Sequence, residues 1–310
     1  MRMARLSPSP APAPTCRGMP DGGQAPHAVA GVRSLPRRPA GREYRSITNP
    51  VERTITVLER LASAPQGLSV TEIAAAMRVN KAIAFRVLAG LQMKGYVEQD
   101  PLSLRYRATL QLAALAFTLI DSLGLEEICK PFLDQLAAET SELVQLAVVD
   151  GHDMIFVARA QGDQRVTVTP LLGRRVALHA SAGGKVWLAS LPEHQAIELA
   201  VAQGLTRLTP RTLTSVAQLR REWAGTRRQG YATVIQEYWD DVNSVGAPVR
   251  VGRQQQVVAA VSVAGPAARF GEDRLRALAP RLIEIADAIG RVWPRPAAPV
   301  ASELARHRHG

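Results

Sequence analysis

The sequence predicts an α+β protein with a small N-terminal domain, a connecting helix and a larger C-terminal domain. Residues 67–107 hold two short amphipathic helices followed by a hairpin pattern. Residues 109–122 read as a helix that is apolar on most sides. Beyond residue 125, short β-prone runs and helices mix without the regular βαβ repeat of a doubly wound sheet. A length of 310 residues suits two domains.

More than half of the net charge of +11 lies in residues 1–48, where eight arginines face only Asp21 and Glu43. This stretch is rich in Pro, Ala and Gly, so it cannot bury enough apolar surface to offset the entropy of ordering. We expect a disordered basic tail, which either strengthens non-specific contact with a polyanion or is inert. Residues 295–310 are expected to form a flexible C-terminal tail.

The sequence contains no recognisable export or membrane segment. No apolar run of secretory length follows the tail arginines, and Arg37-Arg38 lacks the apolar stretch of a twin-arginine export sequence. No segment approaches about 18 consecutive apolar residues. Cys16 and Cys129 give neither a disulfide framework nor a metal cluster. These observations favour a cytoplasmic chain that needs no membrane, metal or other cofactor.

The N-terminal domain is expected to begin with an amphipathic helix that starts at Asn49-Pro50 and ends near Ala64-Pro65. Ser69 then stands at an N-cap position with Glu72 three residues on. This is the spacing of a capping box, in which each side chain satisfies a backbone N–H of the first turn. A second helix is therefore expected to begin directly after Ser69.

The apolar pattern breaks at residues 78–80 and restarts at once, which predicts a third helix after a turn of about three residues. Its inward stripe comprises Ile83, Ala84, Val87, Leu88 and Leu91. At about 100° per residue, the outward face presents Lys81, Ala82, Phe85, Arg86 and Ala89. The pair of helices forms a helix-turn-helix, whose last helix presents its N-terminal half to the major groove of DNA.

A hairpin follows this helix. Gly95 can end the helix, and residues 96–98 and 104–107 read as two strands around the turn residues Asp100-Pro101. Such a wing carries two arginines on one side, where they suit a phosphate backbone. Residues 49–108 are thus predicted to form a winged helix-turn-helix. The predicted DNA contacts are Lys81, Ala82, Phe85, Arg86, Arg105 and Arg107.

Residues 109–124 are interpreted as a linker helix, for which dimer contact or connection to the next domain is preferred over packing within one domain. In the C-terminal domain, residues 125–294, we expect helices over 125–139, 186–189, 193–204, 215–229 and 274–292. The expected strands are 144–149, 154–158, 166–169 and 257–264.

Several short segments follow one another in a specific order and spacing. They are Val51-Glu52-Arg53, Phe85-Arg86-Val87-Leu88, Gly95-Tyr96-Val97, Leu178-His179-Ala180-Ser181, Leu208-Thr209-Pro210-Arg211-Thr212, Gly230-Tyr231-Ala232, Ala247-Pro248-Val249 and Val261-Ser262-Val263. Together they resemble the IclR (isocitrate lyase regulator-like) family of bacterial transcription factors over roughly residues 49–292. The resemblance implies a winged helix-turn-helix, a linker helix that mediates dimerisation, and a GAF-like domain that binds a small organic effector, often a carboxylate. A dimer would match a pseudo-palindromic double-stranded operator.

An effector site can be argued from the residues as well. The glycine-rich stretch 181–184 allows the backbone to approach a ligand closely, and it leads into a helix N-terminus, whose free N–H groups favour an anion. With the positions that the resemblance implies, the predicted effector residues are Ala182, Gly183, Gly184, Val234, Ser244 and Ser262. Val234 stands where many family members have an acid, and Ala264 replaces a frequent Ser. Together with Tyr238-Trp239 nearby, these departures favour a less polar pocket and a larger or aromatic ligand.

The DNA-reading helix also departs from the family pattern. Family members commonly have Lys-Ser-Thr at the start of this helix, whereas this chain has Lys81-Ala82-Ile83. Two hydroxyl groups are absent, which leaves Asn80 as the expected cap. Ala82 and Phe85 can instead meet thymine methyl groups, so the operator sequence of the family does not transfer.

Enzymatic motifs fail on specific positions. Gly184-Lys185 lacks the Ser or Thr that ends a phosphate loop, and the sequence around Ser181 lacks the first Gly of a nucleophile elbow. His179 is expected to pack or bond locally. We favour a regulator, repressor or activator, that self-associates as a dimer or tetramer and responds to an organic acid. Two alternatives stay open: a C-terminal enzyme acting on a small acid, and a DNA-binding protein without a ligand.

Overall fold

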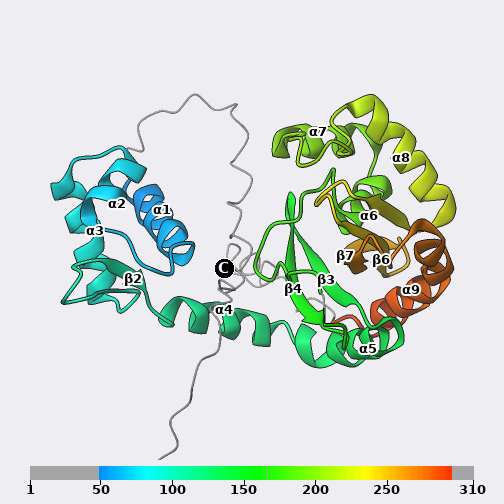
Figure 1. The fold of residues 1–310 in the computed structure, drawn as a ribbon, viewed down its shortest axis with the longest axis horizontal. Coiled ribbons are helices and arrows are strands. Elements are labelled where there is room, and N and C mark those ends of the chain that lie inside the picture. The colour runs from blue at the N-terminus through cyan, green and yellow to red at the C-terminus, as the bar shows by residue number, and fades with distance from the viewer. Residues whose placement is uncertain (1–48, 166, 295–310) are drawn as a thin grey trace, which may run out of the picture. The chain divides into compact units, whose positions relative to one another are not determined.

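The computed structural model describes residues 49–165 and 167–294 (Figure 1). The tails expected at residues 1–48 and 295–310 lie outside this range. The first elements are α1 (Pro50–Ala62), α2 (Val70–Met77), α3 (Lys81–Met93), β1 (Val97–Gln99), β2 (Tyr106–Ala108) and α4 (Gln111–Ser122). The C-terminal domain contains α5 (Leu125–Thr140), β3 (Leu143–Asp150), β4 (Asp153–Ala160), α6 (Ala182–Ser190), α7 (Glu193–Gln203), α8 (Val216–Gln229), β5 (Ala232–Ile235), β6 (Val242–Val251), β7 (Gln256–Pro266) and α9 (Glu272–Val292).

Side-chain caps start the helix-turn-helix. Ser69 Oγ accepts a hydrogen bond from the Glu72 N–H (3.2 Å), and the Glu72 carboxylate accepts one from the Ser69 N–H (2.7 Å), which confirms the capping box. Asn80 Oδ1 accepts from the Ile83 N–H (2.9 Å) and caps α3. Arg78 turns the chain between the two helices with a φ of 55°, a left-handed conformation that ends α2.

The inward stripe of α3 forms the centre of the N-terminal core. Ala84 and Leu88 have no exposed surface, and Leu91 is 6% exposed, as the periodicity predicted. Side chains from α1, α2, β1 and β2 complete this core, which comprises Val57, Leu61, Ile73, Ala74, Met77, Ala84, Leu88, Leu91, Val97 and Tyr106.

The predicted wing forms, but its second strand is shorter than expected. β1 and β2 pair antiparallel with Glu98 opposite Arg107, and β2 begins at Tyr106 rather than at Leu104. Leu104 has a φ of 55°, which cannot continue a strand. Asp100 organises the turn instead, because its carboxylate accepts hydrogen bonds from the backbone N–H groups two and three residues on.

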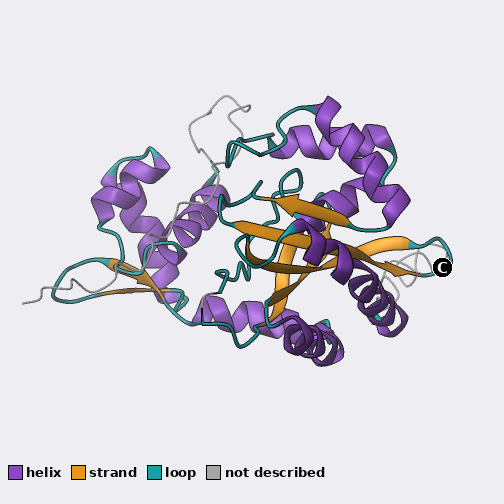
Figure 2. Cartoon of the chain, turned by 45° about the vertical axis from the view of Figure 1, so that its right-hand side comes forward, coloured by secondary structure: helices purple, strands orange, loops and turns teal. Residues whose placement is uncertain are grey.

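The C-terminal domain is built on one antiparallel five-stranded sheet of order β4-β3-β7-β6-β5. Figure 2 draws its strands in orange, with helices packed around them in purple. Helices α5 and α9 pack on one face, where they share one hydrophobic cluster with alternate side chains of the central strands. Helix α6 packs on the other face and is in turn contacted by α7 and α8. Both faces of the sheet are therefore buried, which explains why β7 reads as a continuous apolar run.

The prediction of a strand over residues 166–169 is wrong for residues 167–169, the part of this segment that the structure describes. Residues 167–169 are not in a strand, and Val168 packs against Leu143 and Ala264 at the sheet. The alternation of valine and threonine therefore reflects one buried side chain in an irregular segment.

Helix α6 begins at Ala182, four residues earlier than expected at 186. Ser181 caps it, because Ser181 Oγ accepts a hydrogen bond from the Gly184 N–H (3.1 Å). The glycine pair 183–184 lies inside the helix, where the reading from the sequence placed an irregular stretch.

Strands β5 and β6 were not expected, and Pro248 explains why β6 is difficult to predict. The Val242 carbonyl accepts from the Gln236 N–H, so alternate residues of β6 point their backbone groups toward β5. Pro248 is one of these alternate residues, so its backbone also points toward the β5 side. However, it lies beyond Gly246, which pairs with Ala232, the first residue of β5, so no β5 residue lies opposite Pro248. The missing N–H of proline therefore breaks no sheet hydrogen bond.

We predict that Ser69→Ala loosens α2, because the loss of an N-cap costs about 1 kcal/mol. Amide exchange in peptides covering residues 70–77 is expected to accelerate about fivefold. Thr71→Ala, an exposed position in the same helix, serves as the control and is expected to leave exchange unchanged or slower. Equal protection in the Ser69→Ala variant and the unaltered chain would contradict the role of the cap.

Candidate functional site

The outward face of α3 presents the side chains predicted to contact DNA. Lys81, Ala82, Phe85 and Arg86 are all exposed, and Phe85 is 59% exposed. The ion pairs found within residues 49–165 and 167–294 do not include Lys81 or Arg86. Two available cations beside an exposed aromatic ring make a contact surface suited to a polyanion with apolar groups.

Arg105 has an intramolecular role that the sequence analysis did not expect. Its Nε and Nη2 donate to the Gly67 carbonyl oxygen (3.1 and 3.0 Å), and Nη2 also lies 3.0 Å from Glu72 Oε2. The guanidinium group thus fastens the wing to the start of α2. These bonds engage one edge of the guanidinium group, so the phosphate contact expected of Arg105 stays a prediction for the N–H groups that they leave open.

Glu72 is the shared acceptor of this arrangement. The Ser69 N–H and hydroxyl group, followed by Arg105, hold the pKa of Glu72 below its usual range. A lowered pKa in the folded state means that the carboxylate contributes its stabilisation at neutral pH. This contribution is lost only when the pH falls through the lowered value.

Arg107 lies within β2 and is partly buried. Its aliphatic part packs beside Gly67, where a Cβ atom would come within 2.9 Å of Arg107 Cγ. Arg107 Nε is buried and has no hydrogen-bond partner. The two wing arginines therefore both contact the turn at Gly67, whose φ of 71° favours glycine.

A cavity of about 50 Å³, here named the sheet cavity, lies between the sheet and the start of α6. It contains five of the six residues predicted to bind an effector: Ala182, Gly183, Val234, Ser244 and Ser262. Its remaining lining residues are Gln145, Phe156, Val168, Leu171, Ala180, Ser181, Tyr238, Trp239, Val242 and Ala264.

Sheet register explains why these distant residues meet. Val234 lies opposite Ser244, and Ser244 lies opposite Ala264, so one row of side chains crosses β5, β6 and β7. In the adjacent row, Ser262 lies opposite Gln145 on β3. Residues paired across antiparallel strands point to the same face, and this face is the one covered by α6.

Gly246 allows α6 to approach the sheet. It lies opposite Ser262, and a Cβ atom at this position would come within 2.9 Å of the backbone and side chain of Ala182. The first turn of α6 therefore rests directly on the sheet at the edge of the cavity.

Gly184 is the exception among the predicted effector residues. It does not line the sheet cavity; a Cβ atom there would lie 2.4 Å from the Leu178 Cα. Gly184 faces the segment that precedes α6, whereas Ala182 and Gly183 face the sheet cavity. Its absence of a side chain is explained by helix packing rather than by access for a ligand.

Sequence reasoning missed Gln145, and it used Tyr238 and Trp239 to favour an aromatic ligand without naming them as residues of the site. Gln145 is 4% exposed, and its Nε2 has no hydrogen-bond partner. A single polar residue within the apolar run 143–149 was the available indication. The rings of Tyr238 and Trp239 meet edge to face with centroids 4.9 Å apart. Both residues lie in the loop between β5 and β6, and this loop brings them to the cavity.

A buried charge cluster lies next to the sheet cavity. Lys185, 1% exposed, donates through Nζ to Glu237 Oε1 (2.6 Å), to Glu222 Oε1 (3.2 Å) and to the Thr233 carbonyl oxygen (3.1 Å). Burial raises the pKa of Glu237, and the nearby ammonium group opposes that rise. The cluster links α6 to α8, to β5 and to the loop between β5 and β6.

His179 bonds locally, as expected. Its Nε2 lies 2.9 Å from the Thr206 carbonyl oxygen, and the residue is 3% exposed. Burial lowers its pKa, so the neutral ring that donates to Thr206 is the form present at neutral pH.

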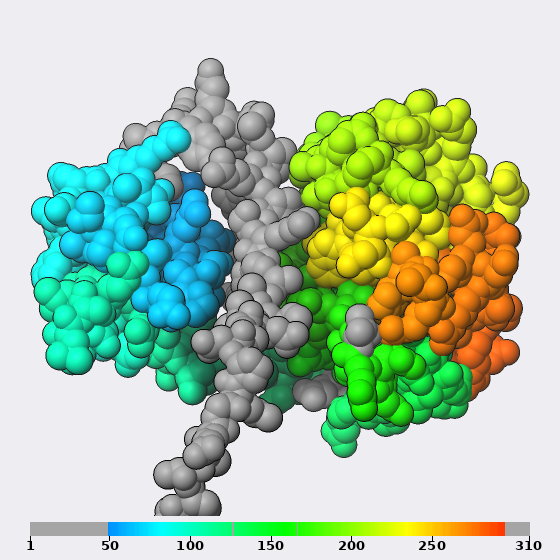
Figure 3. Space-filling model, viewed as in Figure 1, coloured from blue at the N-terminus to red at the C-terminus, as the bar shows by residue number. Residues whose placement is uncertain are grey.

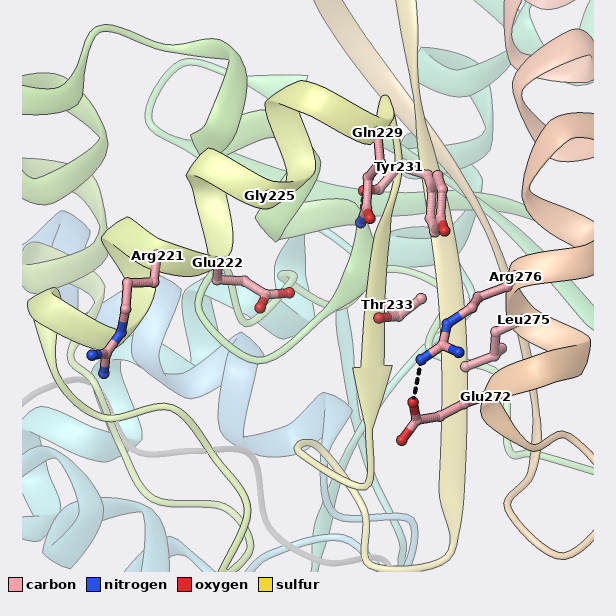
Figure 4. A pocket seen from close by; sticks show the side chains of 9 residues that line it. All are labelled: Arg221, Glu222, Gly225, Gln229, Tyr231, Thr233, Glu272, Leu275 and Arg276. Atoms are coloured by element: carbon pink, nitrogen blue, oxygen red, sulfur yellow. Dashed lines mark hydrogen bonds and ion pairs between the residues drawn. The ribbon is translucent and has the colours of Figure 1, made fainter.

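A second depression of about 240 Å³ lies among α8, β5 and α9, whose residues adjoin at the surface in yellow and orange (Figure 3). Seven of its nine lining residues have polar side chains. Glu272 is paired with Arg276 among its lining residues (2.8 Å; Figure 4). Glu222, another lining residue, is paired with Lys185 (3.2 Å). Since its carboxylates already have cationic partners, this depression offers less unsatisfied binding capacity than its size suggests.

Comparison with known proteins decides the family. The family model of the IclR helix-turn-helix domain matches residues 50–101, and that of the bacterial transcriptional regulator IclR C-terminal domain matches residues 117–291. The chain belongs to the IclR family. It is therefore a DNA-binding transcriptional regulator with a winged helix-turn-helix and a C-terminal α+β domain.

Relatives within the IclR family cover most of the chain. The transcriptional regulator XynR of Escherichia coli K12 is 29% identical over 251 residues, which are 81% of this chain and 99% of XynR. KipR of Bacillus subtilis 168 is 30% identical over 225 residues, 72% of this chain and 89% of KipR. The crystal structure of Thermotoga maritima IclR aligns with a TM-score of 0.63 at 27% identity, covering 78% of this chain and 98% of that structure.

Two kinds of feature are absent from residues 49–165 and 167–294. No helix among them is long and apolar enough to cross a membrane. Within the same residues, no group of three or more His, Cys, Asp or Glu side chains is placed to hold a metal ion.

We predict opposite effects for two glycines inside helices. Gly184→Ala is expected to lower the free energy of unfolding by about 1–3 kcal/mol, because the added methyl group meets the Leu178 backbone. Gly225→Ala in α8 is the matched control: its methyl group meets no atom within 4 Å, so a gain of about 0.5–1 kcal/mol is expected. Urea unfolding followed by tryptophan fluorescence measures both. A Gly184→Ala variant as stable as the unaltered chain would refute the packing role.

Proposed function

We propose that residues 49–108 read a double-stranded operator and that a small, largely apolar or aromatic acid in the sheet cavity modulates this binding. The observation that carries the proposal is the convergence of five predicted effector residues, from α6, β5, β6 and β7, on one cavity. Residues 109–124 link the two functions. Residues 125–294 form the sensing domain in this proposal.

DNA recognition would divide between charge and shape. Lys81 and Arg86 supply cationic donors for phosphates or base edges, while Ala82 and Phe85 offer apolar contact to thymine methyl groups. Arg107 contributes positive charge to the wing. Arg105 holds the wing in place through Gly67 and Glu72, and it adds a phosphate contact only through donors that these bonds leave open.

Self-association would use α4. None of its residues is buried, although Leu115, Phe117 and Leu119 are large and apolar, with exposed fractions of 57%, 62% and 63%. Apolar surface of this extent on one helix is costly in water. A second copy of the chain is the occupant that we propose, since two identical α4 helices would bury their apolar faces together and place two winged domains on a pseudo-palindromic operator.

The sensing domain would act by binding rather than by catalysis. The hydroxyl group of Ser181 is used as a helix cap, His179 bonds to a backbone carbonyl, and Lys185 is held by two carboxylates. These contacts support ligand recognition without a nucleophile. Effector binding would change operator affinity by favouring one arrangement of the regulator over another. A cytoplasmic location and the absence of a cofactor remain part of the proposal.

Arg86→Ala is expected to weaken operator binding by about 1–3 kcal/mol, because a base or phosphate contact is lost. Gel-shift titration at fixed salt measures the change, using the DNA upstream of the gene for this regulator and neighbouring promoters. Lys130→Ala, which removes one exposed positive charge from α5, is the matched control and should bind normally. Unchanged affinity of the Arg86→Ala variant would exclude Arg86 from the interface.

Replacing both Leu115 and Leu119 by Asp is expected to weaken self-association by about 3 kcal/mol or more, because two buried leucine side chains are lost. Sedimentation velocity over a concentration series would show a shift toward monomer. Thr118→Asp changes an exposed polar position of the same helix and is expected to associate as the unaltered chain does. An unaltered sedimentation coefficient in the double variant would place the dimer contact elsewhere.

A further inference from the structure

We infer that Gln145 selects the head group of the effector, and that the effector has one hydrogen-bond-accepting head of at most a single negative charge on an apolar, planar body. This inference rests on the proposed effector function of the sheet cavity. It names a recognition residue on β3, a strand from which the sequence analysis expected none.

Gln145 is placed as an unused donor. It lies on the central part of the sheet, is 4% exposed and lines the cavity, and its Nε2 has no hydrogen-bond partner. A buried amide without a partner destabilises the fold, so an amide aimed into a cavity is expected to meet a ligand there. The other polar side chains of the lining are neutral: the serine hydroxyl groups and the Tyr238 hydroxyl group donate and accept, and the Trp239 indole N–H donates.

Neutral donors converge at one end of the cavity. Ser262 lies directly opposite Gln145 on the neighbouring strand, and the first turn of α6 rests on Gly246, the next position in the same row. The N–H groups of Ala182 and Gly183 belong to that first turn, which has no preceding helical carbonyls to bond. The amide, the hydroxyl group and the helix N-terminus together suit a carboxylate or another accepting head.

The remainder of the cavity excludes a second charge. No Asp, Glu, Lys, Arg or His side chain is among its lining residues. Phe156, Leu171, Tyr238 and Trp239 contribute the large apolar and aromatic side chains of the lining. A second carboxylate or an ammonium group on the ligand would lose its hydration without gaining an ionic partner. Dicarboxylates and amines are therefore disfavoured.

Entry of a ring requires lining side chains to move. The cavity has a volume of about 50 Å³, whereas benzene occupies cavities of about 150 Å³. Tyr238 and Trp239 lie in the loop between β5 and β6 and are partly exposed, whereas Phe156 and Leu171 are buried, so we expect Tyr238 and Trp239 to be the side chains that shift. Ligand binding is thus expected to change the fluorescence of Trp239.

The test uses the full chain and four probes: benzoate, cyclohexanecarboxylate, benzamide and phthalate. Isothermal titration and tryptophan fluorescence measure binding to the unaltered chain and to the Gln145→Leu, Gln145→Glu and Gln135→Leu variants. Benzoate should bind the unaltered chain at least tenfold more tightly than it binds Gln145→Leu, and phthalate should bind at least tenfold more weakly than benzoate. The Gln135→Leu change, on the exposed side of α5, should have no effect.

The Gln145→Glu variant keeps the shape of the side chain, but it is expected to favour a ligand head that donates hydrogen bonds over one that accepts them. Its carboxylate would repel benzoate, with an expected loss of about 100-fold at pH 8, yet it can accept hydrogen bonds from benzamide, which should bind at least as well as it does to the unaltered chain. Near-ultraviolet circular dichroism verifies that each variant is folded. Selective loss of benzoate with retained benzamide supports a head-group contact, since misfolding would abolish both.

The outcomes distinguish the role of Gln145 from the effector function of the sheet cavity. Equal benzoate affinity in the unaltered chain and in Gln145→Leu would overturn the role of Gln145 and leave the effector proposal standing. Phthalate binding as tight as that of benzoate would overturn the single-charge limit. If the unaltered chain bound none of the four probes, the effector proposal and this inference would fail together.

Discussion

The close approach of α6 to the sheet is the constraint on which the sensing domain depends. Gly246 leaves room for Ala182 on the sheet side, and Gly184 leaves room for the Leu178 backbone on the other side. Interiors of proteins are packed too densely to absorb an extra methyl group at either contact. Once the helix is held between these two surfaces, its first turn necessarily faces the serines of β6 and β7 and the amide of β3. The sheet cavity, which we propose as the ligand site, is a consequence of that packing.

Short-range patterns predicted the N-terminal domain well. The capping box, the Asn80 cap and the buried stripe of α3 each depend on residues within a few positions of one another, so their geometry follows from helix periodicity alone. The wing was predicted as a hairpin, but not its anchorage. Arg105 reaches Gly67 across 38 positions of sequence, and no local pattern indicates such a contact.

The predicted effector residues came from two sources: the glycine-rich stretch 181–184, and the positions that the family resemblance implies. Five of the six share one cavity, whereas Gly184, predicted from the glycine-rich stretch, does not line it. Strands β5 and β6 escaped prediction since Pro248 and Gly246 are poor strand formers whose cost disappears in their tertiary setting. The role of Gln145 also depends on tertiary structure. The pairing of β3 with β7 places Gln145 opposite Ser262, which is 117 positions away in the sequence.

The latch formed by Gly67, Arg105 and Glu72 has a consequence for how this regulator engages a duplex. A wing that is already bonded to α2 loses little conformational entropy when it binds DNA. Most of the favourable contact free energy therefore contributes to affinity. Counterion release, rather than folding of a loose arm, would then dominate the thermodynamics of association. A rigid wing of this kind would tolerate little variation in groove geometry, and the regulator would then discriminate operators by the shape of the double helix as well as by its bases.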